Sequence, residues 1–114
     1  MSECLFCRIV KKEIPAKLVH EDDDLVAFDD KNPQAPLHVL VVPKRHIPSL
    51  DALEPGDDVL AGKLLRVAAQ IAKERGVAER GWRSVVNVGR EGGQLVFHIH
   101  LHLLGGRPMF WPPG

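Results

Sequence analysis

The stretch FHIHLHLLGG, residues 97–106, places a histidine at every second position and an apolar side chain between. Successive side chains of a β-strand point to opposite faces, so this alternation predicts a strand with one histidine face and one apolar face. Gly105 and Gly106 end the strand. We expect the apolar face, which begins at Phe97, to pack in the core and the histidine face to line a cleft. The alternative is a solvent-facing strand, although a surface strand more often carries Lys, Glu or Thr.

The rest of the chain predicts an α+β domain with a largely antiparallel sheet of about five strands. Apolar spacing predicts a short helix in CLFCRIVKKE and a long helix that Asp57 or Asp58 caps and Gly76 ends. The apolar stripe of the long helix comprises Val59, Leu60, Leu64, Val67, Ala68, Ile71 and Ala72. The other predicted strands are residues 18–20, 25–29, 38–43 and 82–88. Residues 38–43 are almost wholly apolar, so we expect them at the centre of the sheet.

The composition limits the classes of protein and partner. The 114 residues suit one domain, 1–114, and 15 basic residues balance 15 acidic ones. This balance disfavours nucleic acid as a partner but allows a pocket for a single nucleotide. No apolar run reaches the roughly 18 residues of a membrane helix, and MSECLFCRIVKKEIP lacks the apolar region of a signal peptide. We therefore expect a cytoplasmic protein without a membrane partner, whose cysteines stay reduced.

Three histidines at this spacing allow two kinds of chemistry. Same-face neighbours on a strand lie about 6.8 Å apart, so two can bind one metal ion, whereas all three span about 13.6 Å. A catalytic zinc held by all three is therefore a strained alternative. Otherwise His100, with an imidazole on each side, is the expected nucleophile, because a neutral imidazole can attack phosphorus and form a phospho-histidine intermediate. One neighbouring histidine would bind the phosphate or protonate the leaving group.

The glycine-rich loop GREGGQ, residues 89–94, leads into the histidines. Its glycines, Gly93 among them, let backbone N–H groups approach an anion closely. Asn87, just before the loop, can donate amide hydrogens to the same oxygens. We therefore expect this loop and Asn87 to bind a phosphate group.

The pattern H-φ-H-φ-H-φ-φ, in which φ is apolar, resembles the signature of the histidine triad (HIT) superfamily of nucleotide hydrolases and transferases. The segments KEIPAK, PQAPLHVLVVPKRHI, VVNVG, GGQ, HLLGGRP and WPPG are similar to the Hint branch of nucleoside phosphoramidases, and they run through nearly the whole chain. The resemblance implies a HIT-like fold whose sheets join across a homodimer. It also implies hydrolysis of purine nucleoside 5'-phosphoramidates, in which AMP or GMP is linked to an amine, with no cofactor required for catalysis.

The resemblance assigns roles to four histidines. His100 is similar to the nucleophile of the family, and His102 is similar to the histidine that contacts the phosphate and the leaving group. His38 and His98 resemble a supporting pair behind them.

The resemblance further implies a set of substrate-binding residues. Asp30 in FDDKNP is similar to the carboxylate that binds the ribose in this family, and a carboxylate suits this task because it can accept hydrogen bonds from two vicinal hydroxyls. The implied phosphate ligands are Asn87, Gly93 and the backbone of Val96, and the apolar purine slot comprises Phe6, Ile9, Phe28 and Leu40. Trp111 resembles a residue that reaches toward the site of the other subunit. The structural alternatives are a turn cap for Asp30, core positions for the four apolar residues and tail packing for Trp111.

Two positions depart from the Hint pattern. Leu95 stands where these proteins often carry a polar residue near the leaving group, and leucine cannot hold or protonate a departing amine. Lys31 stands where an apolar residue usually borders the nucleotide. Its charge can serve an acidic extension of the substrate, or it is simply a solvated loop charge. The resemblance therefore does not fix the leaving-group preference or the turnover.

Cys4 and Cys7 form a C-x-x-C pair, which in a reducing compartment indicates a metal or redox role. This pair is a common half-site for zinc, and His46 and His98 offer the third and fourth ligands. Other HIT branches that begin with C-x-x-C resemble this arrangement, with the first triad histidine bound to a structural zinc. The alternative is that the cysteines are small buried apolar residues, since Hint proteins generally lack them.

Three functions stay open at this point. The first is a phosphoramidase, and the second is a dinucleoside polyphosphate hydrolase or nucleotidyl transferase that uses the same histidines. The third is a nucleotide-binding scaffold with weak activity. The presence of all four histidines with Asn87 favours an enzyme, whereas Leu95 mildly favours the scaffold.

Overall fold

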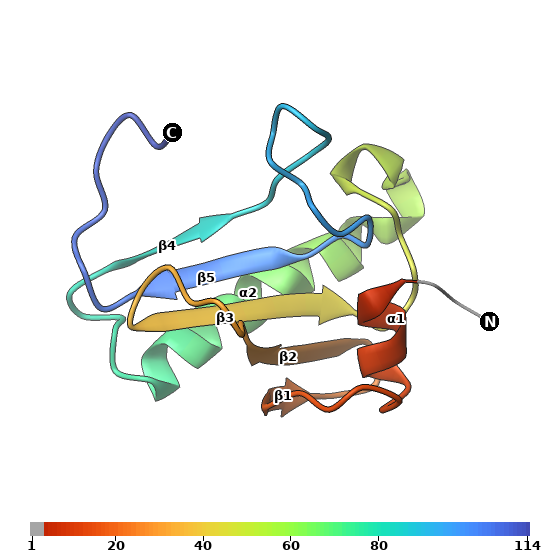
Figure 1. Cartoon of the computed structure of the whole chain (residues 1–114), viewed down its shortest axis with the longest axis horizontal. Helices are drawn as coiled ribbons and strands as arrows, with labels where there is room; N and C mark the ends of the chain where they lie inside the picture. Colours follow the sequence, from red (N-terminus) through yellow and green to blue (C-terminus); the bar gives the residue numbers. More distant parts are fainter. Residues whose placement is uncertain (1–3) are drawn as a thin grey trace.

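Five strands form one antiparallel sheet in the computed structural model, which describes residues 4–114 (Figure 1). The strands lie in the order β1-β2-β3-β5-β4, so β3 is central, and every neighbouring pair is antiparallel. Their bounds are β1 Leu18–Glu21, β2 Leu25–Asp29, β3 Leu37–Pro43, β4 Trp82–Val85 and β5 Leu101–Gly105. The predicted α+β class, the antiparallel sheet and the central place of the apolar strand are confirmed.

One short and one long helix accompany the sheet, as predicted. Helix α1 (Leu5–Val10) lies in front of one end of the sheet in Figure 1, and α2 (Asp58–Glu74) lies behind it. Two 3₁₀ turns, η1 (Leu50–Ala52) and η2 (Pro55–Asp57), lead into α2. Within residues 4–114, no helix has the length and apolarity needed to span a membrane.

Strand β3 belongs to two cores at once. Its residues Val39 and Val41 pack under α2, whereas Leu40 and Val42 pack under α1. Both faces are covered, which explains why the strand is buried along its whole length and is apolar except at His38. We call the two clusters the α2 core and the α1 core. The α2 core also includes Leu25, Ala27, Leu64, Val67, Ile71, Ile99, Leu101 and Leu103, and the α1 core also includes Phe6, Ile9, Val26 and Phe28.

The predicted stripe of α2 is wrong at one position. Val59 is 85% exposed, whereas the buried residues of the helix are Leu64, Val67, Ala68, Ile71 and Ala72. Val59 lies one turn before Lys63 and two turns before Arg66, so it shares the polar face of the helix. Asp57 occupies the predicted N-cap position, but its side chain does not cap α2 and instead accepts from the N–H of Glu54.

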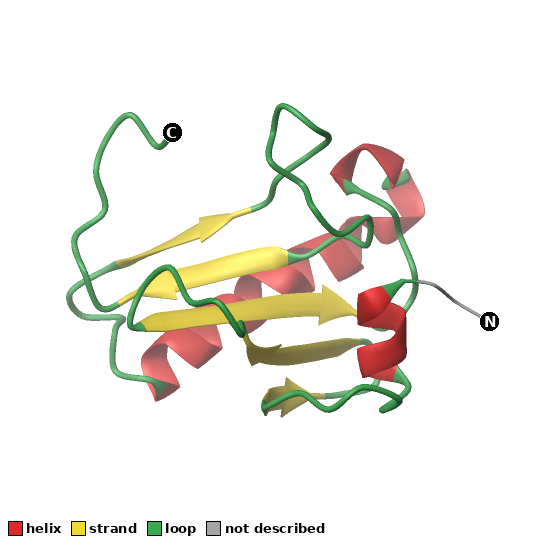
Figure 2. Cartoon of the chain, in the orientation of Figure 1, coloured by secondary structure: helices red, strands yellow, loops and turns green. Residues whose placement is uncertain are grey.

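The histidine strand is shorter than predicted. Strand β5 begins at Leu101, so the first two histidines of the triad precede it in a loop (Figure 2). Leu101 pairs with Val41, and continuing this register would bring Pro43 opposite Ile99. Proline has no N–H to donate, and the N–H of Ile99 donates instead to the carbonyl of Ile47 at 2.6 Å.

Strand β4 is shortened for a related reason. Val85 pairs with His102, so residue 87 would need a partner at residue 100, before β5 begins. The predicted strand 82–88 therefore ends at Val85. Phe97 lies in the loop and is 57% exposed, so the prediction that it packs in the core is wrong.

Candidate functional site

Most residues that the sequence assigned to substrate binding line one cleft of about 850 Å³ on the α1 side of the sheet. They are Phe6, Ile9, Phe28, Asp30, Lys31, Leu40, Asn87, Gly93, Leu95, Val96, His100 and His102. The sequence did not indicate the further lining residues Leu5, Ile14, Pro15, Ala16, Lys17, Asp29 and Pro33. Several of these lie between α1 and β1, a segment without a periodic pattern. We call this space the nucleotide cleft, after the ligand that the sequence predicts for it.

The four apolar residues of the predicted purine slot are both core and cleft wall. Phe6, Ile9, Phe28 and Leu40 are buried in the α1 core, and each also lines the nucleotide cleft. Phe6 contacts Phe28 edge-on at a centroid distance of 5.5 Å and the ring of His100 at 4.9 Å. The α1 core therefore forms an apolar wall that ends at an imidazole.

Hydrogen bonds to backbone carbonyls fix which nitrogen of His98 and His100 carries the proton. The Nε2–H of His98 donates to the carbonyl of Pro43 at 2.8 Å, and the Nδ1–H of His100 donates to the carbonyl of His98 at 2.7 Å. A carbonyl can only accept, so the lone pairs lie on Nδ1 of His98 and Nε2 of His100. Burial lowers the pKa of both imidazoles, although these hydrogen bonds act in the opposite direction. His100 thus has a neutral ring with an Nε2 lone pair, as a nucleophile requires.

A second hydrogen-bond chain orients His102. The backbone N–H of Gln34 donates to Nδ1 of His38 at 3.0 Å, so a neutral His38 carries its proton on Nε2. This Nε2 lies 2.9 Å from Nδ1 of His102, which therefore accepts and leaves the proton of His102 on Nε2. Burial lowers the pKa of His38, and burial together with the neighbouring His100 and His38 lowers the pKa of His102 to about 4. His102 therefore offers a neutral N–H donor beside His100.

The side chain of Asp30 caps a turn and also lines the nucleotide cleft. Its Oδ1 accepts from the N–H of Asn32 at 2.8 Å, so the predicted structural alternative, a turn cap, is confirmed. Its Oδ2 lies 3.4 Å from Nε2 of His38. A carboxylate offers about four acceptor positions, so these contacts leave capacity for hydroxyl donors in the cleft.

The sequence did not indicate the role of Gln94, which holds the glycine-rich loop in place. This buried side chain accepts from the N–H of Gly89 at 3.0 Å and donates to the carbonyls of Pro48 (2.8 Å) and Val96 (3.1 Å). Gly93, which lines the cleft, has a φ of 85°, a conformation that favours glycine. The sequence carried no signal for this role, because only the structure shows that the amide is buried and therefore needs several partners.

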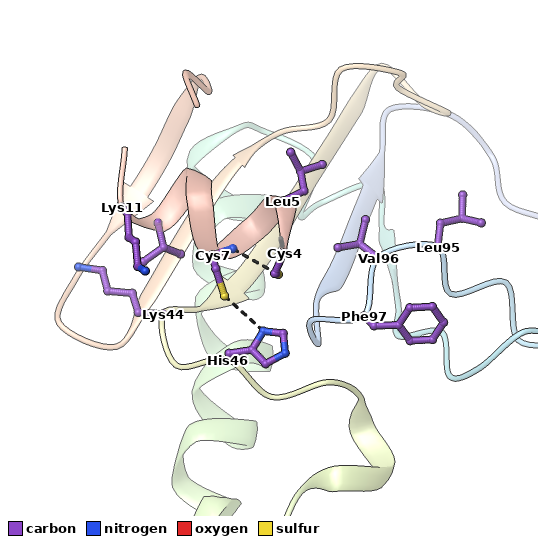
Figure 3. A pocket seen from close by; sticks show the side chains of 10 residues that line it. Cys4, Leu5, Cys7, Lys11, Lys44, His46, Leu95, Val96 and Phe97 are labelled. Atoms are coloured by element: carbon purple, nitrogen blue, oxygen red, sulfur yellow. Dashed lines mark hydrogen bonds between the residues drawn. The ribbon is translucent and has the colours of Figure 1, made fainter. Parts of the chain in front are cut away.

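Cys4, Cys7, His46 and His98 form a second cluster of side chains (Figure 3 shows the first three). The Sγ atoms of Cys4 and Cys7 lie 3.3 and 3.5 Å from Nδ1 of His98. The Nδ1 of His46 lies 3.3 Å from Sγ of Cys7 and 3.2 Å from Nδ1 of His98. In tetrahedral zinc sites with bonds of about 2.3 Å to sulfur and 2.05 Å to nitrogen, such atoms lie about 3.3–3.6 Å apart. The cluster therefore fits zinc, and the Nδ1 lone pair of His98 faces the other three ligand atoms.

Three residues that were predicted to act in catalysis or substrate binding do not line the nucleotide cleft. His38 lies behind His102, and His98 belongs to the cysteine cluster. Trp111 is 82% exposed in the C-terminal tail. The first two reach the cleft through a hydrogen bond to a histidine that lines it, whereas Trp111 has no such path within the described residues 4–114.

Known proteins resemble this chain along most of its length. The family model of the HIT domain matches residues 11–109. A HIT-like protein of Synechocystis is 51% identical over 98% of this chain and 97% of its own. The purine nucleoside phosphoramidase of Escherichia coli K12 is 45% identical over 94% of this chain and 90% of its own. The crystal structure of a HIT family hydrolase from Legionella pneumophila, 50% identical, superposes with a TM-score of 0.97 and covers 98% of this chain and 100% of its own. With its α+β fold and its three alternating histidines, this chain belongs to the HIT family.

Proposed function

We propose that this protein hydrolyses purine nucleoside 5'-phosphoramidates through a nucleotidyl-histidine intermediate on His100. One observation carries the proposal: a neutral His100, with its Nε2 lone pair available, lines the same cleft as the N–H donor His102 and the carboxylate of Asp30. The 45% identity to the purine nucleoside phosphoramidase of Escherichia coli supports the same class of substrate.

The chemistry takes two steps at phosphorus. Nε2 of His100 first attacks the phosphorus, the Nε2–P bond forms and the P–N bond breaks. The departing amine takes up one proton from solvent, and the Nε2–H of the neutral His102 donates a hydrogen bond to the departing nitrogen or to a phosphate oxygen. Water then attacks the phosphorus, gives up one proton to solvent and breaks the Nε2–P bond, which releases the nucleoside monophosphate and restores His100.

Different walls of the nucleotide cleft bind different parts of the substrate. In this proposal the purine lies against Phe6 and its apolar neighbours, and the hydroxyls of the ribose donate to Asp30. The amide of Asn87 and the backbone near Gly93 and Val96 hold the phosphate oxygens. Because Gln94 fixes the loop, these donors are in place before the substrate arrives.

We further propose that Cys4, Cys7, His46 and His98 hold a structural zinc ion. Such an ion would supply a cross-link between α1, the segment after β3 and the loop before β5, and it would take no part in the reaction.

We also propose that the protein forms a homodimer in the cytoplasm. The exposed side chains of Phe110 and Trp111 in the tail support the dimer, because large apolar side chains exposed together often mark an interface.

A parallel assay distinguishes the candidate activities. Wild-type protein and the His100→Ala variant are incubated with AMP linked to an amine and with diadenosine polyphosphates, and the products are separated by chromatography. We expect the wild-type protein to cleave the P–N bond of AMP linked to an amine faster than it cleaves the diadenosine polyphosphates. We expect the His100→Ala variant to cleave neither. Lys17 and Lys31 line the cleft and favour the second candidate, because they can meet additional phosphates. Preferential cleavage of the diadenosine compounds would select that candidate, and binding of AMP without any cleavage would select the scaffold.

A further inference from the structure

A second cleft, of about 860 Å³, lies beside the nucleotide cleft. It runs between α1 and residues 95–97, and Figure 3 shows the cysteines and His46 between its two ends. Leu95 and Phe97 lie at one end in this view, and Lys11 and Lys44 lie at the other. The proposed zinc ligands Cys4, Cys7 and His46 line its middle, and the proposed hydrolysis gives no role to its two ends.

The two clefts share one wall. Leu5, Leu95 and Val96 line both of them, so one ridge of side chains separates two parts of the same surface. A phosphoramidate has two arms that meet at phosphorus, namely the nucleoside and the amine. The nucleotide cleft accounts for the nucleoside arm and places the phosphorus near His100. The amine arm must continue beyond it, and the second cleft begins at the shared ridge.

The end of the second cleft at the ridge is apolar and exposed. Leu95 is 89% exposed, Phe97 57% and Leu5 44%, and all three line the cleft. Exposed large apolar side chains that gather at a groove are typical of a ligand site, because a ligand covers them when it binds. The part of the amine arm next to the nitrogen is therefore expected to be apolar.

The far end of the second cleft carries positive charge. Lys11 and Lys44 line it, and Lys44 pairs with Glu21 at 3.0 Å. The same carboxylate also pairs with Lys12 at 3.0 Å, so one negative charge is shared between two ammonium groups while Lys11 adds a third. This surplus of positive charge suits an anion on the ligand.

We propose that the second cleft binds the amine leaving group, and that the preferred amine is a short peptide with an apolar first side chain and a free carboxylate. The apolar side chain covers Leu95 and Phe97, and the carboxylate reaches Lys11 and Lys44. This inference rests on the proposed phosphoramidase function and names the amine that the reaction releases.

A matched pair of substrates tests the charge. AMP is linked through its phosphorus to the amino group of phenylalanyl-glycine or of phenylalanyl-glycinamide, which differ only in the terminal carboxylate. We expect kcat/KM for the carboxylate substrate to exceed that for the amide about two- to tenfold, since two partly exposed ion pairs contribute modestly. Lys11→Ala and Lys44→Ala should each reduce this ratio, and Lys11→Glu should invert it.

Lys73→Ala is the matched control, because Lys73 is an exposed lysine on α2 that lines neither cleft. It should leave the ratio unchanged. Hydrolysis of both substrates with a ratio near one, insensitive to Lys11 and Lys44, would overturn the inference alone and leave the cleft to another occupant, such as the tail of a second copy. If neither substrate is hydrolysed, the proposed function fails. Calorimetric Kd values for the intact substrates on His100→Ala then decide the inference separately, and equal Kd values for the pair would overturn it.

Discussion

Leu101 and Leu103 point from β5 into the α2 core, whereas His102, on the same strand, and His100, just before it, line the nucleotide cleft on the opposite face. On the α2 side the buried side chains are apolar and contribute through the surface they remove from water. On the α1 side the histidines are held by hydrogen bonds, three of which involve backbone groups. Adjacent residues of one segment therefore serve different ends, so substitutions on the two faces should separate stability from catalysis.

The strongest test of this separation is His100→Ala. We expect turnover of an AMP-amine substrate to fall by several orders of magnitude, because no covalent intermediate can form, while AMP still binds. The melting temperature should fall only modestly, because the substitution removes the hydrogen bond to the carbonyl of His98 and a ring contact with Phe6. Steady-state kinetics, calorimetry with AMP and thermal denaturation measure the three quantities. A variant that retains a tenth of the wild-type turnover would exclude His100 as the nucleophile.

On the opposite face, Leu103→Ala should lower the free energy of unfolding by about 2–5 kcal/mol, because it leaves a cavity in the α2 core. The kcat per folded molecule should be unchanged. Urea denaturation and active-site titration check both values. Leu65→Ala is the control, since Leu65 lies on α2 but is 57% exposed. A loss of kcat without a loss of stability would mean that the two faces are not separate.

The Cys4→Ser variant tests whether the cysteine cluster serves stability or catalysis. Protein purified without chelator should carry about one zinc per chain, and the variant should lose the metal and melt at a lower temperature. A chelator should lower the melting temperature of the wild type but leave the variant unaffected. Metal-free wild-type protein of normal stability would refute the zinc site and leave His98 as a hydrogen-bonding neighbour of His100.

A smaller effect on stability is expected at the turn between β1 and β2. The carboxylate of Asp22 accepts from Nε2 of His20 (2.7 Å), from the N–H groups of Asp24 and Leu25, and from Nζ of Lys63 on α2 (3.0 Å). Burial acts to raise the pKa of Asp22, but these hydrogen bonds outweigh it and hold the pKa below its ordinary value. The ionised carboxylate thus stabilises the fold above the unfolded pKa of about 3.9, and this contribution is lost as the pH falls through the lower folded pKa.

Asp22→Asn should therefore cost about 1–2 kcal/mol at pH 7, and the difference from the wild type should shrink below about pH 4. Asp23→Asn, an exposed neighbour in the same turn, should show little effect at either pH. Urea denaturation at several pH values measures the difference. A penalty that persists unchanged at pH 2 would show that the charge of Asp22 is not its cause.

The smallest expected change is at Leu95, on the ridge between the two clefts. Leu95→Ser should raise turnover a few-fold for amines that leave poorly and less for amines that leave well, if a hydroxyl assists departure. Each tenfold gain corresponds to about 1.4 kcal/mol of barrier. Equal changes for both kinds of amine would show that this position does not act on the leaving group.

The sequence predicted the α+β class, the central apolar strand and the long helix because each depends on the local spacing of apolar residues along the chain. It misplaced the start of β5, because the cause lies in Pro43, far away in the chain but opposite Ile99 in the sheet. It grouped three histidines on one face, whereas His98 turns to the cysteines, as the zinc hypothesis from the C-x-x-C pair had predicted. The residues that line the nucleotide cleft were predicted through the resemblance to the HIT superfamily. No repeating pattern in the sequence indicated the hydrogen bonds of Gln94, because they depend on a loop that folds around this side chain.

One residue, His98, takes part in both clusters. Its Nδ1 faces Cys4, Cys7 and His46, and its carbonyl accepts from the ring of His100. Two ligands that act on one residue are thermodynamically linked, and such linkage is reciprocal. Whatever factor a metal ion at the cysteines applies to the affinity for AMP, AMP applies to the affinity for the metal. We therefore expect AMP added during purification to change the amount of metal that the protein retains, unless this factor equals one.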